Sequence, residues 1–428
     1  MTRLWCELAW LGGEGAEPGV LLQVEGERLV RVAPGVQAPA DAERLPGLTL
    51  PGMANAHSHA FQRALRGRTH TGKGSFWTWR EQMYELVERL DPDSFFALSR
   101  ASFGEMALAG VTCVGEFHYL HHGPGGTPYG DPNAMGEAVI AAAAEAGIRI
   151  TLLDTCYLHG GSERFRDADA HAWAERVGVL TGGSAARLGA AIHSVRAVDP
   201  GSARTVAEWA GGRPLHAHVS EQPAENEECL AAHGRTPTGL LFDAGALSGD
   251  FTAVHATHVT DEDVALLGGA GSTCCLCPTT ERELADGIGP AGNLRAAGAA
   301  LAVGSDSQAV IDLFEEARAI ELDERLATGV RGNHRPAELL RAATVDGHAA
   351  LGWPEAGLLE PGALADLVTV SLDGVRLAGT APGDVVGSTV FAAAASDVRH
   401  VMVGGCWIVR EGSHVSLDVP SELKAALA

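Results

Sequence analysis

The chain has 428 residues, enough for one large barrel domain with a smaller module, or for two or three ordinary domains. Hydrophobic residues make up 46% and charged residues 20%, which is typical of globular proteins. The formal net charge of −23 argues against nucleic acids and membranes as partners, because binding to either needs a positively charged surface.

The start of the chain, MTRLWCELAW, does not predict a signal peptide, because Glu7 interrupts the apolar run. No uncharged apolar stretch reaches the roughly 18 residues that a transmembrane helix needs. The eight cysteines do not form the framework of a small disulfide-stabilised domain. We therefore expect reduced thiols in a cytoplasmic protein.

The two ends of the chain differ from its middle. Residues 1–50 and 361–428 contain short segments that alternate apolar and polar residues, such as GVLLQVEGERLVRV and LADLVTVSL, and these predict strands. In residues 51–360, short apolar runs alternate about eight times with helical stretches, which predicts an α/β fold of the (β/α)8 barrel type. An open doubly wound sheet is the alternative, although no G-x-G-x-x-G motif follows an early strand to support a dinucleotide site.

A pair of histidines ends the first strand expected in the barrel, in TLPGMANAHSHAFQR. His57 and His59 are two residues apart, so both imidazoles can lie on the same side of the strand and face one metal ion. The pattern is weak on its own, because His216 and His218 repeat it.

The order of the polar strand ends strengthens the metal hypothesis. His57 and His59, then His218, then His255, and finally Asp306 each close a predicted strand. In a barrel of this type the active site lies at the carboxyl ends of the strands. Three histidines with one carboxylate form a site suited to zinc or iron.

The segments PGMANAHSHAFQR, HVSEQ, VHATH and GSD resemble the amidohydrolase superfamily over nearly the whole chain. The resemblance implies a barrel over residues 51–360 and a small β-sandwich built from residues 1–50 and 361–428. It also implies that the metal ligands are His57, His59, His218 and Asp306. Glu221 would be the proton shuttle and His255 a catalytic histidine beside the metal.

A single divalent metal is expected, most simply Zn²⁺, with Fe²⁺ as the alternative. Binuclear members of the superfamily bridge two metals with a carboxylated lysine from a middle strand, and this chain has no lysine between Lys73 and Lys424. The metal would supply hydroxide near neutral pH. In that mechanism Asp306 accepts the proton of the water, His255 steadies the developing charge, and Glu221 carries a proton to the departing nitrogen.

Further segments, HAFQRALRG, SFWTWRE, GEFHYLHH, IHSVRAV and CPTTERELADG, most resemble the formimidoylglutamate deiminase family. This resemblance implies hydrolysis of N-formimino-L-glutamate to N-formyl-L-glutamate and ammonia, in histidine degradation, by a homodimer. An acidic small-molecule substrate needs anchors, and arginine pairs well with carboxylates. The resemblance assigns one end of the substrate to Gln62, Arg80 and Tyr119, and the other to His193 and Arg196. Glu281 and Asp286 have no role in this mechanism.

Other functions are compatible with the same motifs. A related deaminase acting on guanine, cytosine or an adenosine derivative is the first alternative, although two arginines near the metal would then lack an explanation. A non-catalytic scaffold on the same fold is the second, and it conflicts with a complete set of ligand and acid–base positions. A chlorohydrolase or an amide-cleaving member is the third, because a fold does not settle the function.

Overall fold

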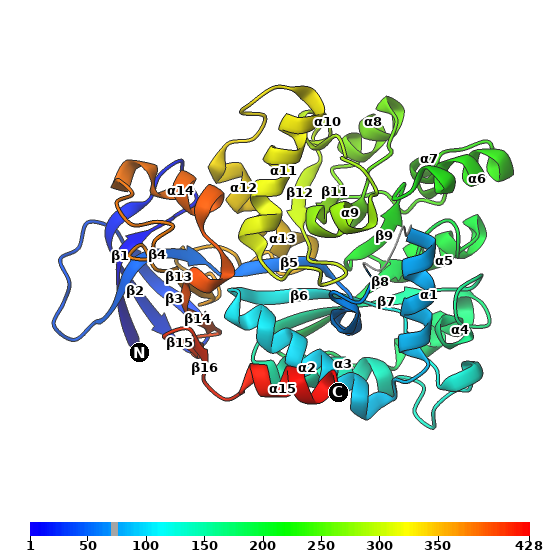
Figure 1. Cartoon of the computed structure of the whole chain (residues 1–428), viewed down its shortest axis with the longest axis horizontal. Helices are drawn as coiled ribbons and strands as arrows, with labels where there is room; N and C mark the ends of the chain where they lie inside the picture. Colours follow the sequence, from blue (N-terminus) through cyan, green and yellow to red (C-terminus); the bar gives the residue numbers. More distant parts are fainter. Residues whose placement is uncertain (70–75) are drawn as a thin grey trace.

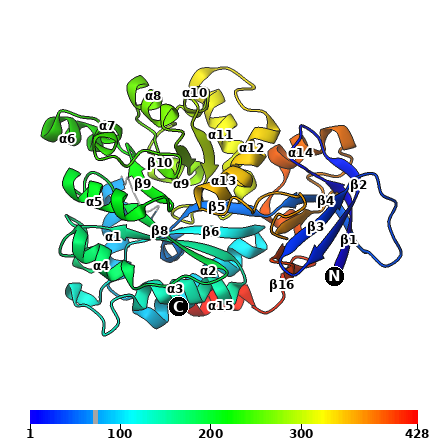
Figure 2. The same ribbon diagram turned by 180° about the vertical axis from the view of Figure 1, so that it is seen from behind.

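The computed structural model describes residues 1–69 and 76–428. In this part of the chain, strands β5 to β12 form a parallel barrel (Figures 1 and 2). The barrel strands are hydrogen-bonded in the order β12-β11-β10-β9-β8-β7-β6-β5, and β12 also contacts β5, so that the ring closes. The predicted (β/α)8 barrel is confirmed, and the open doubly wound sheet is wrong. The strands are β5 (Met53–Ser58), β6 (Val111–His118), β7 (Arg149–Cys156), β8 (Ala186–Ile192), β9 (Leu215–Val219), β10 (Phe251–His255), β11 (Thr273–Leu276) and β12 (Ala300–Val303).

Helices connect these strands and cover the outside of the barrel (Figure 1). They are α2 (Pro92–Leu108), α3 (Ala134–Ala146), α4 (Ala170–Gly178), α5 (Pro200–Ala210), α6 (Pro223–His233), α7 (Pro237–Asp243), α8 (Asp261–Gly269), α10 (Ala291–Ala297), α11 (Leu313–Thr328), α12 (Pro336–Ala343) and α13 (Val345–Ala350). Two further helices, α1 (Phe76–Val87) and α9 (Pro278–Leu284), follow β5 and β11 and lie at the end of the barrel where the strands finish.

The sequence explains why these segments form buried strands and short connections. Every residue of β6 and β7 is buried, because a parallel strand is covered on one side by helices and on the other by the barrel interior. Helix α3 ends at Gly147, whose φ of 77° is the left-handed conformation that glycine adopts without strain, and β7 begins two residues later.

Both ends of the chain build a second sheet beside the barrel, as predicted. Its order is β16-β15-β14-β13-β4-β1-β2-β3, and it is antiparallel apart from the β1–β4 pair. The predicted boundaries at residues 50 and 360 remain predictions. The strands are β1 (Thr2–Ala9), β2 (Glu17–Glu25), β3 (Arg28–Ala33), β4 (Glu43–Pro51), β13 (Leu367–Val370), β14 (Val398–Val403), β15 (Cys406–Arg410) and β16 (Ser413–His414).

The C-terminal segment also contributes helices to the barrel wall. Helix α14 (Val385–Ala392) contacts α11 and α12, and helix α15 (Val419–Ala426) contacts α2. The terminal sheet is therefore attached to the barrel at more than one place. In the part of the chain that the structure describes, no helix has the length and apolar character needed to span a membrane.

Gly52 connects the last N-terminal strand of the terminal sheet to the first strand of the barrel. Strand β4 ends at Pro51 and β5 begins at Met53. A Cβ atom at Gly52 would lie 2.2 Å from Oγ1 of Thr112 on β6, so only glycine fits at this position without a shift of the threonine. Strand β5 then ends in the His57–His59 pair.

Candidate active site

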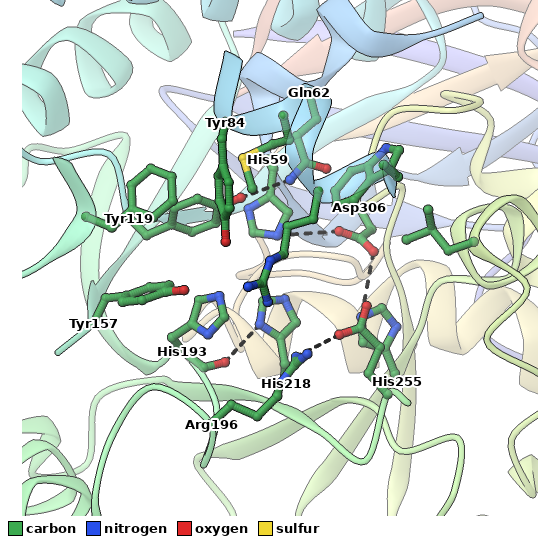
Figure 3. Close-up of a pocket in the computed structure, with 16 residues that line it drawn as sticks. His59, Gln62, Tyr84, Tyr119, Tyr157, His193, Arg196, His218, His255 and Asp306 are labelled. Carbon is green, nitrogen blue, oxygen red and sulfur yellow. Dashed lines mark hydrogen bonds and ion pairs between the residues drawn. The ribbon is translucent and has the colours of Figure 1, made fainter. Parts of the chain in front are cut away.

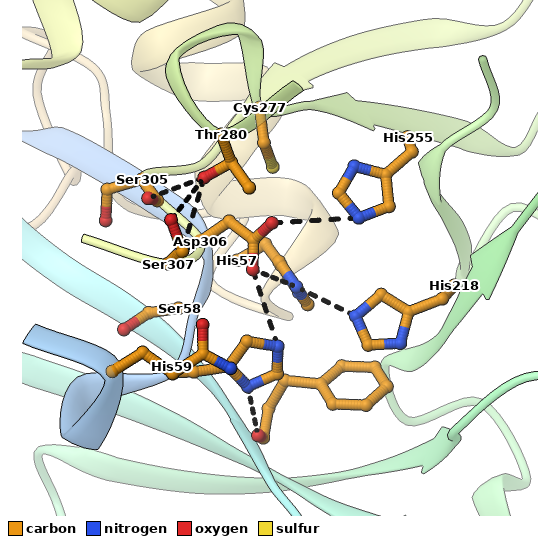
Figure 4. A network of polar contacts seen from close by, with 12 residues as sticks. His57, Ser58, His59, His218, His255, Cys277, Thr280, Ser305, Asp306 and Ser307 are labelled. Carbon is orange, nitrogen blue, oxygen red and sulfur yellow. Dashed lines mark hydrogen bonds and ion pairs between the residues drawn. The ribbon is translucent and has the colours of Figure 1, made fainter. Parts of the chain in front are cut away.

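Side chains from the ends of three strands meet at one end of the barrel (Figure 4). His57 and His59 come from the end of β5, His218 from β9, and Asp306 from the residues after β12. The Nε2 atom of His57 lies 3.2 Å from Nε2 of His218 and 3.3 Å from Oδ1 of Asp306. The Nε2 atom of His59 lies 3.4 Å from the same aspartate oxygen. All four side chains are buried, so these polar atoms face one another rather than bulk water.

The backbone holds the last strand against the first. The amide of Asp306 donates to the carbonyl of His57 at 3.0 Å, and the amide of His59 donates to the carbonyl of Asp306 at 3.1 Å. A Cβ atom at Gly304 would lie 2.7 Å from the carbonyl oxygen of His57, so glycine is needed where the two segments approach. Asp306 itself has a φ of 44°, a strained conformation of the kind that clusters at functional sites.

In two of the histidines, a backbone carbonyl fixes the proton on Nδ1, the ring nitrogen that faces away from the cluster. Nδ1 of His59 lies 2.9 Å from the carbonyl oxygen of Phe117, and Nδ1 of His218 lies 2.9 Å from that of His193. A carbonyl oxygen only accepts hydrogen bonds, so both Nδ1 atoms are the donors. In a neutral imidazole the other nitrogen carries no proton, so both Nε2 atoms have a free lone pair. Nε2 of His59 and Oδ1 of Asp306 are therefore two acceptors that face each other without a proton between them.

This donor set fits a divalent cation. Ligands about 2.0–2.1 Å from a tetrahedral zinc ion lie roughly 3.3–3.4 Å from one another, close to the separations above. His57, His59 and His218 form one group of potential ligand atoms, and His57, His255 and Asp306 form an overlapping one. Burial lowers the pKa of His57 to about 3, so its ring is a neutral base at neutral pH, as a metal ligand must be.

Glu221 and His255 lie next to this cluster. Nε2 of His255 is 3.7 Å from Oδ2 of Asp306 and 3.9 Å from Oε1 of Glu221. Burial by itself would lower the pKa of His255, but the hydrogen bond with Glu281 and the charges of Glu221 and Asp306 raise that pKa to about 10. The two predicted acid–base side chains therefore face the same space as the predicted ligands.

This space is a cavity at the end of the barrel, whose wall is drawn in Figure 3. All of the residues that the sequence proposes for substrate binding line it: Gln62, Arg80, Tyr119, His193 and Arg196. The amide of Gln62 donates to the hydroxyl of Tyr119 at 2.9 Å. Nη2 of Arg196 lies 3.0 Å from Oε2 of Glu221.

The sequence analysis missed part of the cavity wall. Tyr84, Tyr157 and Phe165 also line the cavity. Tyr84 lies one helical turn after Arg80 on α1, and Tyr157 directly follows β7. Helical spacing and strand-end position are the signals that could have found these two tyrosines.

A second buried group of potential metal ligands consists of His118, His121 and Asp154. Here the guanidinium of Arg176 already contacts both oxygens of Asp154, at 2.9 and 3.0 Å. Arg176 also pairs with Asp167 at 2.8 Å. A fixed cation therefore occupies the place where a metal would bind the carboxylate, and this group acts as a scaffold under the loop after β6.

The family model of the amidohydrolase family matches residues 48–408. The chain belongs to this family, and it is a hydrolase that acts on carbon–nitrogen bonds.

The chain is also similar to individual enzymes of this family. The chain is 36% identical to the formimidoylglutamate deiminase of Pseudomonas aeruginosa, over 97% of this chain and 96% of the relative. It is 31% identical to a 5-methylthioadenosine/S-adenosylhomocysteine deaminase of Natronomonas pharaonis, over 87% of this chain and 83% of the relative. Among solved structures, an amidohydrolase from Brucella melitensis is 34% identical with a TM-score of 0.92, covering 100% of this chain and 99% of that one.

Proposed function

We propose that this protein is a deiminase that hydrolyses N-formimino-L-glutamate to N-formyl-L-glutamate and ammonia. The observation that carries the proposal is the placement of two arginines, Arg80 and Arg196, in the wall of the cavity that contains the histidine–aspartate cluster. An amidine joined to a dicarboxylate needs a hydrolytic centre and two anion anchors at the same time. The similarity to the formimidoylglutamate deiminase of Pseudomonas aeruginosa supports the same substrate.

We assign the metal to His57, His59, His218 and Asp306. Three imidazoles and one carboxylate favour zinc, with ferrous iron as the alternative. When bound, the metal would supply the activation of water near neutral pH. A single ion is the economical assignment, because the chain has no lysine between Lys73 and Lys424, and none of the barrel strands that the structure describes contains one.

The chain's own side chains divide the remaining work. Asp306 accepts the proton that water loses as its oxygen attacks the amidine carbon. His255, whose Nε2 faces Asp306, stabilises the negative charge that develops on that oxygen. Glu221 delivers a proton to the amidine nitrogen, which leaves as ammonia. Water and amidine are consumed, and a formamide and ammonia are formed.

We expect the two ends of the substrate to bind residues on different sides of the cavity. We assign the α-carboxylate end to Gln62, Arg80 and Tyr119, whose amide and hydroxyl already share a hydrogen bond. His193 and Arg196 take the other end. Arg196 contacts Glu221 at 3.0 Å, so an anchored carboxylate would place the rest of the substrate beside the proton shuttle.

One observation favours a second candidate. Tyr84, Tyr119 and Tyr157 give the cavity an aromatic wall on which a purine could stack, and a relative acts as a 5-methylthioadenosine/S-adenosylhomocysteine deaminase. That substrate carries no pair of carboxylates for Arg80 and Arg196, so it ranks second.

Ammonia release from zinc-reconstituted protein tests the proposal. N-formimino-L-glutamate should react with a kcat/KM at least about 100-fold above those of guanine and 5-methylthioadenosine, because these lack the two carboxylates for the anchors. N-formimino-L-aspartate carries both carboxylates but is one methylene shorter, so we expect a smaller difference, of about 10- to 100-fold. A nucleobase or nucleoside as the best substrate would replace this proposal with the second candidate. The homodimer and the cytoplasmic location remain predictions, and light scattering of the purified protein checks the first.

A further inference from the structure

We propose that the turn Cys277–Glu281, which is the N-cap and first turn of α9 directly after β11, positions the active site through two side chains: Glu281 holds His255, and Thr280 holds the loop that carries Asp306. The inference rests on the proposed function and deepens it. The turn belongs to the segment CPTTERELADG, whose acidic residues the mechanism above does not use.

Glu281 reaches the catalytic histidine from helix α9, which follows the neighbouring strand β11. Its Oε1 lies 3.3 Å from Nδ1 of His255 and accepts the amide hydrogen of Cys277 at 2.9 Å. The side chain of Glu281 is buried, so water does not compete for this oxygen. One carboxylate oxygen therefore ties the imidazole to the first residue of the turn.

This contact fixes which edge of the imidazole faces the reaction. An ionised carboxylate only accepts hydrogen bonds, so Nδ1 of His255 is the donor. Nε2 is then directed to the other side, toward Asp306 and Glu221. His255 also has a φ of 70°, a strained backbone conformation of the kind that persists at functional sites.

Thr280 holds the loop on both sides of Asp306 (Figure 4). Its hydroxyl accepts the amide hydrogen of Ser307 at 3.2 Å and lies 3.1 Å from the hydroxyl of Ser307. The same hydroxyl lies 3.4 Å from the carbonyl oxygen of Ser305, to which it can donate. Ser305 and Ser307 flank Asp306, so Thr280 restrains the strained segment from which the carboxylate projects.

The turn is itself anchored to the barrel wall. The amide of Thr279 donates to Oε2 of Glu316 at 3.0 Å, and its hydroxyl donates to the other oxygen of the same carboxylate. Glu316 lies on α11 and is fully buried. Three successive residues therefore connect the helix wall, the aspartate loop and the catalytic histidine, and such outer contacts orient the groups that bind or react.

Variants of the two side chains separate positioning from simple stabilisation. In Glu281→Gln an acceptor oxygen remains for Nδ1 of His255 and for Cys277, and in Glu281→Ala neither contact remains. Thr280→Ser keeps the hydroxyl, and Thr280→Val removes it at nearly constant volume. Arg282→Gln is the matched control, because Arg282 lies on the same helix but pairs with Glu315 and Asp323 at the surface.

The experiment measures kcat and KM for N-formimino-L-glutamate, zinc per chain, the rate of zinc loss to a chelator, and the melting temperature. For Glu281→Ala we expect kcat to fall by about 100-fold with KM and zinc content nearly unchanged, and for Glu281→Gln to recover most of that loss. Thr280→Val should lose zinc at least about tenfold faster, Thr280→Ser should restore the rate, and Arg282→Gln should match the wild type.

Near wild-type kcat in Glu281→Ala, or wild-type zinc loss in Thr280→Val, overturns the inference. If Glu281→Ala does not fold, Glu281→Met takes its place, because methionine keeps the side-chain volume but offers His255 no carboxylate oxygen. A near wild-type kcat in Glu281→Met, or wild-type zinc loss in Thr280→Val, is then the contrary result. A wild type that releases no ammonia from this substrate contradicts the proposed function instead. The chelator measurements still test the role of Thr280 in that case.

Discussion

The part of the barrel that the structure describes contains two buried histidine–aspartate groups, and in one of them an arginine already pairs with the aspartate. Asp154, beside His118 and His121, is neutralised by Arg176 at 2.9 Å. Asp306 has the imidazoles of His57 and His59 at 3.3 and 3.4 Å and that of His255 at 3.7 Å, and among the described residues no arginine pairs with it. Burying a carboxylate needs a cation. The comparison shows that a residue set alone does not define a metal site, because a nearby guanidinium can take the place of the ion.

Removing the carboxylate of the first group should have the largest effect. We expect Asp306→Ala to lose most of its zinc and at least about 1,000-fold in kcat/KM, because the metal contributes several kcal/mol to the transition state. Metal analysis together with ammonia release checks this expectation. A variant that keeps full zinc and normal turnover would remove the distinction between the two groups.

The second-largest effect is expected from replacing Glu221, the proposed proton shuttle. Glu221→Gln should keep its zinc while kcat falls by roughly 100- to 10,000-fold, since only proton transfer to the leaving nitrogen is lost. Steady-state kinetics on protein of measured zinc content gives the answer. Turnover close to that of the wild type would mean that another group carries the proton.

A smaller effect should follow from the arginine near the first group. Arg196 lies beside Glu221, whereas Arg176 is committed to Asp154 and Asp167. Arg196→Ala should lower kcat/KM for N-formimino-L-glutamate by about 10- to 100-fold, the worth of one charge-assisted hydrogen bond. An unchanged kcat/KM for this acidic substrate counts against the anchor role.

The arginine of the second group should matter for stability rather than for chemistry. Arg176→Gln leaves Asp154 buried without its partner, which should cost about 3–5 kcal/mol of unfolding free energy. The kcat of the folded fraction should stay within about threefold, because Arg176 does not line the cavity. Urea unfolding and kinetics on the same sample measure both quantities, and a large loss of kcat at full folding would contradict the scaffold role.

The stability effect of Arg176→Gln also has a predicted pH dependence. Burial by itself would raise the pKa of Asp154, but the Arg176 guanidinium holds it at about 2, below its unfolded value of about 3.9. A lowered acid pKa adds stability above the unfolded pKa, and this contribution is lost as the pH falls from about 4 towards 2. The difference between wild type and Arg176→Gln should therefore shrink over that interval, and a constant difference would contradict the charge argument.

Much of the fold and the composition of the candidate site could be predicted from the sequence, because both depend on local patterns. Strand period and strand ends are local, so they located the barrel and brought out His57, His218 and Asp306 as potential neighbours. The roles of these side chains remain proposals.

Contacts between distant segments could not be read from the sequence. Arg176 reaches Asp154 from the following helix, and Glu281 reaches His255 from the helix after the next strand. Tyr84 enters the cavity only because α1 lies over the end of the barrel. None of these pairs has a characteristic spacing in the sequence. They depend on how barrel loops pack, which periodicity does not encode.

Anomalous diffraction at the zinc edge from crystals of zinc-reconstituted protein tests the central claim most directly. The account predicts one strong peak per chain, about 2.0–2.2 Å from the Nε2 atoms of His57, His59 and His218 and from a carboxylate oxygen of Asp306. A peak between His118, His121 and Asp154, or no peak among the four predicted ligands, would contradict it.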